Sequence, residues 1–419
     1  MKKSFQTLAL AAAAALVLAA CSKNDGDEQV LTAQEKEMKT AVEQYVPGVI
    51  YSIYGTLADK TSDLCDQFAE AKTLAKAGTL TDAKVQEIAR TFLDAREYWE
   101  KSEAFLFGAA TEFGIDPHID DWPLDLNTLS KTLSNGVLMA DLDKNGADKI
   151  GSVGESSLGF HGLEYILFRD GQVRKAADIV KGEVIVSETD EGQTETYVVT
   201  GLSEIIFAAA VSEDLRNACW RLQVSWDPNA PAERKALVVD ELELPYTAGG
   251  SQYTFGESLL RTGKVGGIHE YWQETVTKIF VDGMQNICDE VAHTKIATAH
   301  SQNAEGEHDP SYIESPYSQR SYFDFKDNIL SIQYSLYGKA DSDANQKGSL
   351  LSFLEKHNAS LASTLKSTMS AALKSLDDCI ASGVPFVKNP ESPLAGEAID
   401  KIDAFNNALG DAADYFSKL

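Results

Sequence analysis

Two side chains that could carry chemistry lie within an otherwise apolar segment. Residues 158–168 read Leu-Gly-Phe-His-Gly-Leu-Glu-Tyr-Ile-Leu-Phe, and only His161 and Glu164 among them ionise near neutral pH. A helix that is apolar on every side is buried, and the i, i+3 spacing places both side chains on one face. A buried carboxylate needs a cation, a proton donor or a metal ion, and imidazole with carboxylate suits iron or zinc. We therefore predict that His161 and Glu164 are metal ligands; the alternative is that they hydrogen-bond to neighbours within the core.

A second pair of charged residues lies where apolar residues are expected. In the helix predicted over 81–107, steps of three and four from Val85 reach Arg96 and Glu103 on the apolar stripe. We expect both side chains to face the interior, and we predict that Glu103 is a third metal ligand and Arg96 an orienting or anion-binding group. The alternative is that Arg96 extends its charge to the surface and that Glu103 lies near an exposed helix end.

The standard catalytic motifs are missing from the sequence. His269-Glu270 is not followed by the second histidine of H-E-x-x-H, and Tyr165 follows Glu164 where the inverted motif H-x-x-E-H requires histidine. The sequence also contains no G-x-S-x-G, no Walker loop and no dinucleotide-binding fingerprint. Whether the chain is an enzyme is therefore left open at this point.

The composition excludes several classes of partner. The 419 residues include 37 Lys and Arg against 64 Asp and Glu, which gives a formal net charge of −27. Binding to nucleic acid requires clustered cations, and so does attachment to anionic lipid headgroups, so we expect neither. The hydrophobic fraction of 43% is ordinary for a globular protein and is sufficient for a sizeable core.

The N-terminus resembles a bacterial lipoprotein signal peptide. Residues 1–20 combine Met-Lys-Lys with an apolar run that is too short to span a bilayer, and Leu18-Ala19-Ala20-Cys21 is similar to a lipobox. We expect cleavage before Cys21, lipidation of that cysteine as a membrane anchor, and a flexible acidic tether over residues 21–28. Because Ser22 and not Asp follows the cysteine, the resemblance favours the outer membrane, on its periplasmic face or at the cell surface.

The elements that must hold these residues are nearly all helical. Long amphipathic periodicities with short connections predict an all-α fold of two helical bundles, over residues 29–245 and 246–419. Alternation around a polar turn over 183–200 predicts one β-hairpin as an insertion. The predicted helices cover residues 29–77, 81–107, 202–226, 265–299, 321–337, 348–382 and 393–418.

Four cysteines remain besides the one in the lipobox, namely Cys65, Cys219, Cys288 and Cys379. An oxidising compartment permits disulfides between them, but buried free thiols are equally compatible with a chain of this size. Their spacing matches no cysteine metal site.

The motifs around these residues resemble the imelysin family of bacterial envelope proteins. The G-x-H-x-x-E motif of that family matches residues 159–164, and further similarities occur over residues 96–105, 119–125, 314–318 and 324–329. The resemblance covers nearly the whole mature chain. It implies an all-helical fold of two bundle-like domains, with the motif near their interface.

The resemblance also implies a function. The family is associated with iron regulation and iron uptake, and some of its members were named as metallopeptidases. The chain is therefore identified as an imelysin-like, lipid-anchored protein of the cell envelope that binds iron, or an iron-bearing ligand, for uptake together with envelope partners. Two alternatives remain: a zinc-dependent metallopeptidase, although two ligands three residues apart are not a complete zinc site, and a surface interaction protein whose polar core is purely structural.

The matched motifs extend the set of expected site residues. Besides the predicted metal ligands, we expect side chains from these motifs to contact a ligand, namely Arg96, Asp121, Trp122, Ser315, Tyr317 and Ser318. We also expect Arg96, Glu103, His161 and Glu164 to converge on one cavity between the two bundles.

Overall fold

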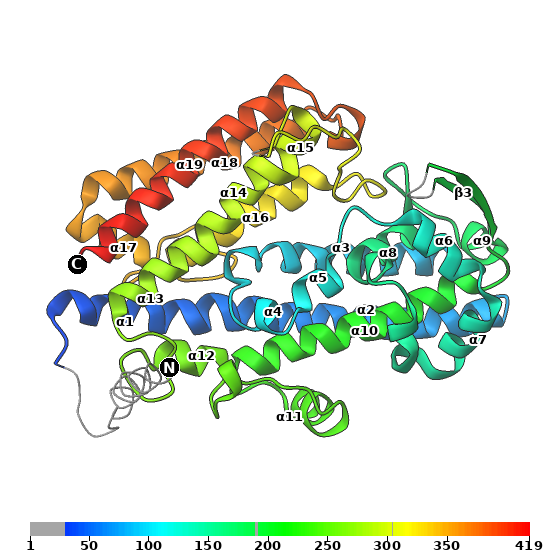
Figure 1. Cartoon of the computed structure of the whole chain (residues 1–419), viewed down its shortest axis with the longest axis horizontal. Helices are drawn as coiled ribbons and strands as arrows, with labels where there is room; N and C mark the ends of the chain where they lie inside the picture. Colours follow the sequence, from blue (N-terminus) through cyan, green and yellow to red (C-terminus); the bar gives the residue numbers. More distant parts are fainter. Residues whose placement is uncertain (1–29, 189–191, 304) are drawn as a thin grey trace, which may run out of the picture.

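The chain folds into two layers of helices, shown in Figure 1 with the C-terminal helices in yellow to red above the blue and green N-terminal ones. The computed structural model describes residues 30–188, 192–303 and 305–419. The predicted signal peptide, Cys21 and the tether over 21–28 lie outside the described residues. Within the described residues, none of the helices has the length and apolar character needed to cross a bilayer.

The N-terminal half is built around the long helices α2 and α10, which pack along each other, with α3 on α2 and α8 on α10. Its helices are α1 (Ala33–Tyr45), α2 (Ser52–Lys76), α3 (Asp82–Glu100), α4 (Ala109–Glu112), α5 (Ile115–Ile119), α6 (Leu126–Ser134), α7 (Gly136–Asn145), α8 (Gly159–Leu167), α9 (Ala176–Lys181), α10 (Ser203–Trp226) and α11 (Ala232–Lys235). Short 3-10 and π segments connect them: η1 (Val46–Tyr51), η2 (Glu103–Phe105), η3 (Gly146–Ser152), η4 (Glu155–Ser157) and η5 (Ala236–Glu241).

The C-terminal half is centred on α18, which packs against α19 and α16. Its helices are α12 (Phe255–Leu260), α13 (Trp272–Lys278), α14 (Asn286–Glu290), α15 (Ala297–His300), α16 (Ser321–Tyr337), α17 (Leu350–His357), α18 (Ala359–Ala381) and α19 (Pro393–Ser417). Its shorter segments are η6 (Ala248–Gly250), η7 (Ile279–Gln285), η8 (Val291–Ile296) and η9 (Phe386–Lys388).

The two halves share one hydrophobic core. A single cluster of buried apolar residues runs through both, from Met38 in α1 to Phe416 in α19. The helix α1 extends beneath the C-terminal layer, where it contacts α13 and α17, and α16 packs on α3. Side chains on these contacting faces therefore meet at a seam between the two layers.

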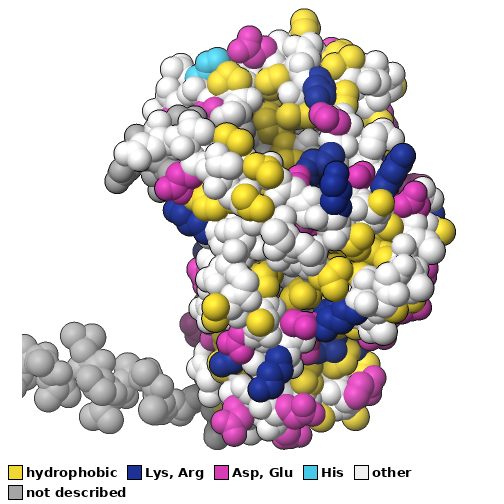
Figure 2. All heavy atoms as spheres, turned by 90° about the vertical axis from the view of Figure 1, so that its right-hand side faces the viewer, with side chains coloured by type: hydrophobic (Ala, Val, Ile, Leu, Met, Phe, Trp, Pro, Cys, Tyr) yellow, Lys and Arg dark blue, Asp and Glu magenta, His cyan; other side chains and the backbone are white. Residues whose placement is uncertain are grey.

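The predicted all-α fold with a β-hairpin insertion is confirmed. Strands β3 (Val184–Glu188) and β4 (Thr194–Val198) pair antiparallel, with Val184 opposite Val198. A second small hairpin, β1 (Phe168–Arg169) with β2 (Gln172–Val173), was not predicted. Figure 2 shows the molecule from the end that is on the right in Figure 1, where basic, acidic and hydrophobic side chains are interspersed.

Three predicted helix boundaries are wrong, each for a local reason. The helix expected over 81–107 ends at Glu100, and a 3-10 turn follows at Glu103. The helix expected over 348–382 is divided by Asn358, whose side chain accepts a hydrogen bond from the backbone of Leu361 and so caps α18. The helix expected over 265–299 begins only at Trp272.

The cysteine alternatives are resolved in favour of free thiols. All four lie buried in the structure and none of them is paired: Cys65, Cys219, Cys288 and Cys379. They pack as small apolar side chains within the core.

Candidate metal and ligand site

The motif helix α8 is held against the segment that precedes Asp120. Gly159 has a φ of +59°, and a Cβ atom at this position would lie 1.9 Å from the carbonyl oxygen of Ile119. A Cβ atom at Gly162 would lie 2.2 Å from the carbonyl oxygen of Ser157. The two glycines therefore permit close backbone approach, which brings the side chain of Asp120 to the face of α8 that carries His161.

His161 lies between two carboxylates. Its Nε2 atom is 3.0 Å from Asp120 Oδ1, and its Nδ1 atom is 3.6 Å from Glu164 Oε2. The exposed fractions of His161 and Glu164 are 2% and 1%, so water does not reach the pair in this conformation. The other oxygen of Glu164 accepts hydrogen bonds from the backbone and the hydroxyl of Ser318, both at 2.7 Å.

Arg96 occupies the centre of the same cluster. Its guanidinium donates to Asp120, forms an ion pair with Glu100, and donates to Glu314 Oε1 at 2.6 Å. Asp120 is held further by the indole of Trp99, which donates to Oδ2 at 2.7 Å. Arg96 therefore faces the interior, as predicted. Its guanidinium is held by buried carboxylates and does not extend to the surface.

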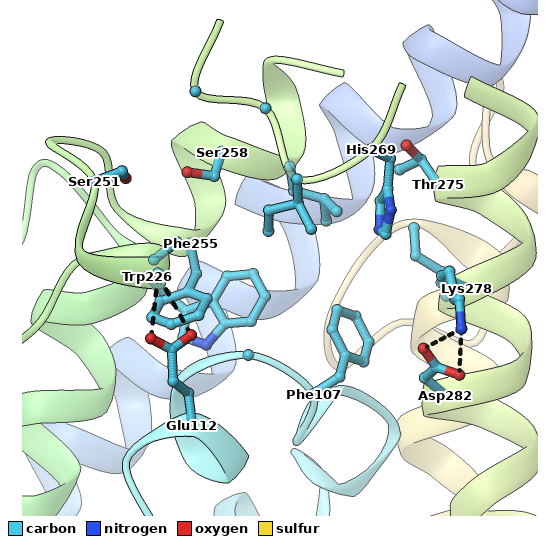
Figure 3. Close-up of a pocket in the computed structure, with 18 residues that line it drawn as sticks. Phe107, Glu112, Trp226, Ser251, Phe255, Ser258, His269, Thr275, Lys278 and Asp282 are labelled. Carbon is cyan, nitrogen blue, oxygen red and sulfur yellow. Dashed lines mark hydrogen bonds and ion pairs between the residues drawn. The ribbon is translucent and has the colours of Figure 1, made fainter. Parts of the chain in front are cut away.

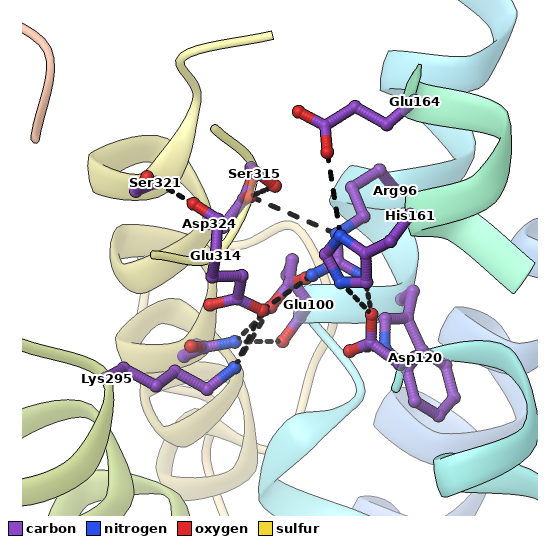
Figure 4. Close-up of polar contacts among 12 residues, drawn as sticks. Arg96, Glu100, Asp120, His161, Glu164, Lys295, Glu314, Ser315, Ser321 and Asp324 are labelled. Atoms are coloured by element: carbon purple, nitrogen blue, oxygen red, sulfur yellow. Dashed lines mark hydrogen bonds and ion pairs between the residues drawn. The ribbon is translucent and has the colours of Figure 1, made fainter. Parts of the chain in front are cut away.

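A second buried cation, Lys295, enters from the C-terminal half. Its ammonium donates to Glu314 Oε1 at 3.0 Å and lies 4.0 Å from Glu100 Oε2. The amide of Asn328 donates to the same oxygen of Glu100 at 2.6 Å. Figure 4 shows that these groups come from both sides of the seam, with Arg96, Asp120 and His161 opposite Lys295, Glu314 and Asp324. We call this set of residues, together with Glu100 and Glu164, the ion network.

The loop before α16 supplies several of these groups through an unusual backbone. Ser315 and Gln319 have φ values of +52° and +61°, which side-chain-bearing residues rarely adopt. Ser315 donates to Asp324 Oδ2 at 2.5 Å, and the hydroxyl of Ser321 donates to the carbonyl of Glu314. A rarely populated backbone conformation persists only where the surrounding contacts hold it in place. Such conformations are common at functional sites.

The electrostatics of the ion network follow from burial and charge pairing. Burial opposes ionisation of Asp120, but the Arg96 guanidinium outweighs it and lowers the pKa of Asp120. Burial would lower the pKa of His161, yet the carboxylates of Asp120 and Glu164 beside its ring raise the pKa to about 9. Burial dominates for Glu100, whose pKa is raised, and for Asp324, whose pKa is raised to about 7. The cluster therefore holds more carboxyl groups than its cations neutralise.

Three side chains of the ion network could hold a metal ion. Asp120, His161 and Glu314 each offer a ligand atom, and these atoms lie within 4.8 Å of one another. One imidazole and two carboxylates are a donor set that suits iron or zinc. Glu314 Oε2 is buried and has no hydrogen-bond partner among the described residues, so part of the donor capacity is unused.

The other predicted site residues have different positions. Glu103 is buried, but it lies outside that group of three; Lys295 and Glu100 are the charges that act most strongly on it, and burial raises its pKa. Asp121 is exposed. Trp122 packs against Tyr312 with ring centroids 4.7 Å apart and the rings tilted by 48°, and Lys295 lies over its ring.

The remaining predicted residues lie at the edge of the ion network. Ser315 and Ser318 are buried and donate to Asp324 and Glu164 respectively. Tyr317 is half-buried and packs edge-on against Tyr165 with ring centroids 5.0 Å apart. Arg96, His161, Glu164, Ser315 and Ser318 are thus brought together. Within the described structure, Glu103, Asp121 and Tyr317 form no hydrogen bond or ion pair with these five residues.

Sequence reasoning missed five members of the ion network. One of them, Asp324, lies in α16 at the start of a recognised motif. Asp120 and Glu314 lie within motifs that were recognised, but in non-helical segments where periodicity cannot show which side chain points inward. Glu100 lies four residues after Arg96, which places both on one helix face, and that spacing could have revealed it. Lys295 lies in the π-helical segment η8, where the helical register shifts.

Comparison with known proteins places these residues in a family context. The family model described as imelysin matches residues 50–413. A stretch of 88 residues is 30% identical to iron-regulated protein A of Synechococcus elongatus, and it spans 21% of this chain and 21% of that protein. The chain therefore covers about a fifth of the length of this curated relative.

Two crystal structures have the same fold. One, assigned provisionally as an iron-regulated protein A precursor from Parabacteroides distasonis, covers 94% of this chain and 98% of its own, with a TM-score of 0.66 and 21% identity. The other, an imelysin-like protein from Psychrobacter arcticum, covers 94% of this chain and 99% of its own, with a TM-score of 0.59 and 12% identity. At these identities the similarity supports the fold alone.

Proposed function

The chain belongs to the imelysin family, and from this premise we propose that it binds iron, or an iron-bearing ligand, through the ion network for uptake in the cell envelope. The observation that carries the proposal is the convergence of ligand atoms from Asp120, His161 and Glu314 within 4.8 Å of one another. The name of the Synechococcus relative supports the choice of iron over other metals.

Arg96 has a defined part in this proposal. Its guanidinium binds Asp120 and Glu314 at the same time. An iron ion bound to these oxygens takes over the charge compensation that Arg96 provides, so binding is an exchange of one cation for another. Because the guanidinium is always charged, iron entry requires that Arg96 move away from at least one carboxylate.

Glu164 acts on the imidazole and not on the metal. His161 directs Nε2 towards Asp120 and Nδ1 towards Glu164. A carboxylate on the second ring nitrogen orients a ligating histidine and raises its basicity. The earlier assignment of Glu164 as a ligand is thus replaced, in this proposal, by a positioning role, and Glu314 and Asp120 take the ligand positions.

The test is a titration of the purified mature protein with Fe²⁺ under anaerobic conditions, made on variants that keep side-chain shape. Asp120→Asn and Glu314→Gln should each weaken iron binding by more than the roughly 10–100-fold that changes around a ligand cost, and Glu164→Gln should fall within that range. Glu204→Gln is the matched control, because Glu204 is also fully buried and bonded by an arginine, Arg174, at 2.5 Å.

The outcomes separate the rival functions. Unchanged iron affinity in Glu204→Gln with losses in the other three variants supports the proposal. Failure of the wild-type protein to bind Fe²⁺ or Fe³⁺ would leave the ion network a structural core, as in a surface interaction protein. Binding of zinc in preference to iron would favour the metallopeptidase alternative, although a His161 that is 2% exposed offers no route for a peptide chain in this conformation.

The cellular context is part of the same proposal. A lipid anchor on Cys21 would hold the protein at the outer membrane, where envelope partners could pass iron onward, and the lipobox-like sequence before Cys21 supports it. Cys21→Ser should release the protein into the soluble fraction of a cell lysate. Unchanged membrane fractionation of this variant would contradict the anchor.

A further inference from the structure

A cavity of about 480 Å³ lies at the seam between the two halves, apart from the ion network. Phe107 and Trp226 line it from the N-terminal half, and Phe255, Leu259 and Ile279 line it from the C-terminal half. Its volume lies within the range of about 300–1,000 Å³ that is typical of small-molecule sites. Figure 3 shows that Phe107, Trp226 and Phe255 come from separate segments and gather on one side, with His269, Thr275 and Lys278 along another.

The aromatic side of the cavity is preorganised. The ring of Trp226 lies 6.0 Å from that of Phe107 and 5.8 Å from that of Phe255, measured between centroids. Gly108 permits this arrangement, because its φ is +91° and a Cβ atom there would lie 2.9 Å from the Phe255 ring and 3.0 Å from the Trp226 ring. Flat faces and edges of this kind favour an aromatic guest.

Two polar groups in the cavity wall have no hydrogen-bond partner among the described residues. Trp226 Nε1 and Ser258 Oγ are both buried and unpaired, and both residues are 1% exposed. A buried tryptophan N–H usually finds a partner, and an unmade hydrogen bond in a buried site is unfavourable. The indole can only donate, and the hydroxyl can donate or accept. A hydroxyl group on a guest could pair with that of Ser258, which lines the cavity.

Among the described residues that line the cavity, none is a free cation that could bind an anionic guest. Lys278, which lines it, is paired with Asp282 at 3.1 Å. Burial lowers the pKa of His269, so its ring is neutral at neutral pH. The carboxylate of Glu112, also at the wall, accepts a hydrogen bond from the backbone of Gly249. The charges present therefore disfavour an anion and favour an uncharged molecule.

The entrance to the cavity is apolar as well. Ile268 lines the cavity and is 47% exposed, and Val265 and Tyr271 in the same segment are 39% and 50% exposed. Large apolar side chains that are exposed next to one another are a feature of binding surfaces. This segment can therefore contact the part of a guest that extends out of the cavity.

We propose that this cavity is a binding site for an uncharged aromatic alcohol of the phenol class, which packs among Phe107, Trp226 and Phe255 and pairs its hydroxyl group with Ser258 Oγ. The inference rests on the cavity and its unpaired groups alone, and it does not depend on iron binding by the ion network.

The test is calorimetric titration of the mature protein with 2-naphthol, with naphthalene as the matched probe that lacks the hydroxyl group. The expected result is saturable one-to-one binding of 2-naphthol. Ser258→Ala should weaken it about fivefold, the amount that one neutral hydrogen bond contributes, and should leave naphthalene binding unchanged. Leu259→Trp, which fills the cavity, should abolish binding of both probes.

Three results would overturn the proposal. These are no binding of 2-naphthol up to its solubility limit, binding that survives in a folded Leu259→Trp protein, and equal weakening of both probes by Ser258→Ala. Thermal melts show which variants are folded. If Leu259→Trp does not fold, Ile279→Trp replaces it, because Ile279 also lines the cavity and the larger ring would fill it; unchanged 2-naphthol affinity in that variant would equally overturn the proposal.

Discussion

The ion network and the cavity beside Trp226 both form where the N-terminal half meets the C-terminal half, yet they use that seam in opposite ways. In the ion network, Arg96 and Lys295 are buried among carboxylates and form ion pairs with them. In the cavity, aromatic walls enclose space and two polar atoms, Trp226 Nε1 and Ser258 Oγ, are unpaired.

The two regions differ in how much each contributes to the stability of the folded chain and in which of their groups a ligand could bind. Buried ion pairs add little net stability against apolar replacements, but removing one partner leaves an uncompensated charge. An unpaired buried hydroxyl, in contrast, already carries its desolvation cost and loses nothing when it is removed. Substitutions at the ion network should therefore be far more damaging to folding than substitutions at the polar groups of the cavity.

The largest expected effect is that of Asp120→Ala. This change removes the common partner of Arg96, Trp99 and His161, and with it one of the carboxylates that compensate the buried charge of Arg96. The free energy of unfolding in a denaturant titration should fall by about 3–5 kcal/mol. Asp121→Ala is the adjacent control, because Asp121 is exposed, and it should change the value by less than about 0.5 kcal/mol. Equal effects of the two substitutions would remove Asp120 from the centre of the network.

An intermediate effect is expected for Gly159→Ala. The added Cβ atom would lie 1.9 Å from the carbonyl of Ile119, so α8 must move away from the segment that positions Asp120. Overpacking and the left-handed backbone together should lower the free energy of unfolding by about 3 kcal/mol. Gly78→Ala is the comparison, because Gly78 has a φ of +71° with nothing within 4 Å of its added Cβ, and it should lose only about 1 kcal/mol. A loss at Gly159 no larger than that at Gly78 would show that close approach of the two segments is not required.

The smallest effect is expected for Ser258→Ala at the cavity. Its hydroxyl has no hydrogen-bond partner among the described residues, so the free energy of unfolding should stay within about 0.5 kcal/mol of the wild-type value. The same denaturant titration measures it. A loss of 2 kcal/mol or so would mean that the hydroxyl is bonded in the folded protein, and the contrast between the two regions would weaken.

The regular parts of the molecule were predictable from periodicity. The long helices α2, α10, α16 and α19 and the hairpin of β3 and β4 occur where alternation and amphipathic spacing predicted them. Arg96 was predicted to face inward because it interrupts an apolar stripe, and the structure places it at the centre of the ion network. Periodicity succeeds in such elements because burial of one face determines their orientation.

The rest of the site depends on segments without a period. Asp120 and Asp121 are neighbours in a non-helical stretch, and only the tertiary contact with α8 decides that Asp120 is buried and Asp121 is exposed. Glu103 was assigned to the stripe of Arg96, but the helix ends at Glu100 and the register is lost. The cavity beside Trp226 is likewise formed in large part by the connections around α12, so no periodic pattern in the sequence predicts it.

The most direct test of the account is an iron-edge anomalous scattering measurement on crystals of the mature protein soaked with Fe²⁺. The account predicts one strong anomalous peak in ligand contact with Asp120, His161 and Glu314, with the Arg96 guanidinium displaced from at least one of the two carboxylates. A peak elsewhere in the molecule, or an ion network with Arg96 still bound to both Asp120 and Glu314 at saturating iron, would contradict it.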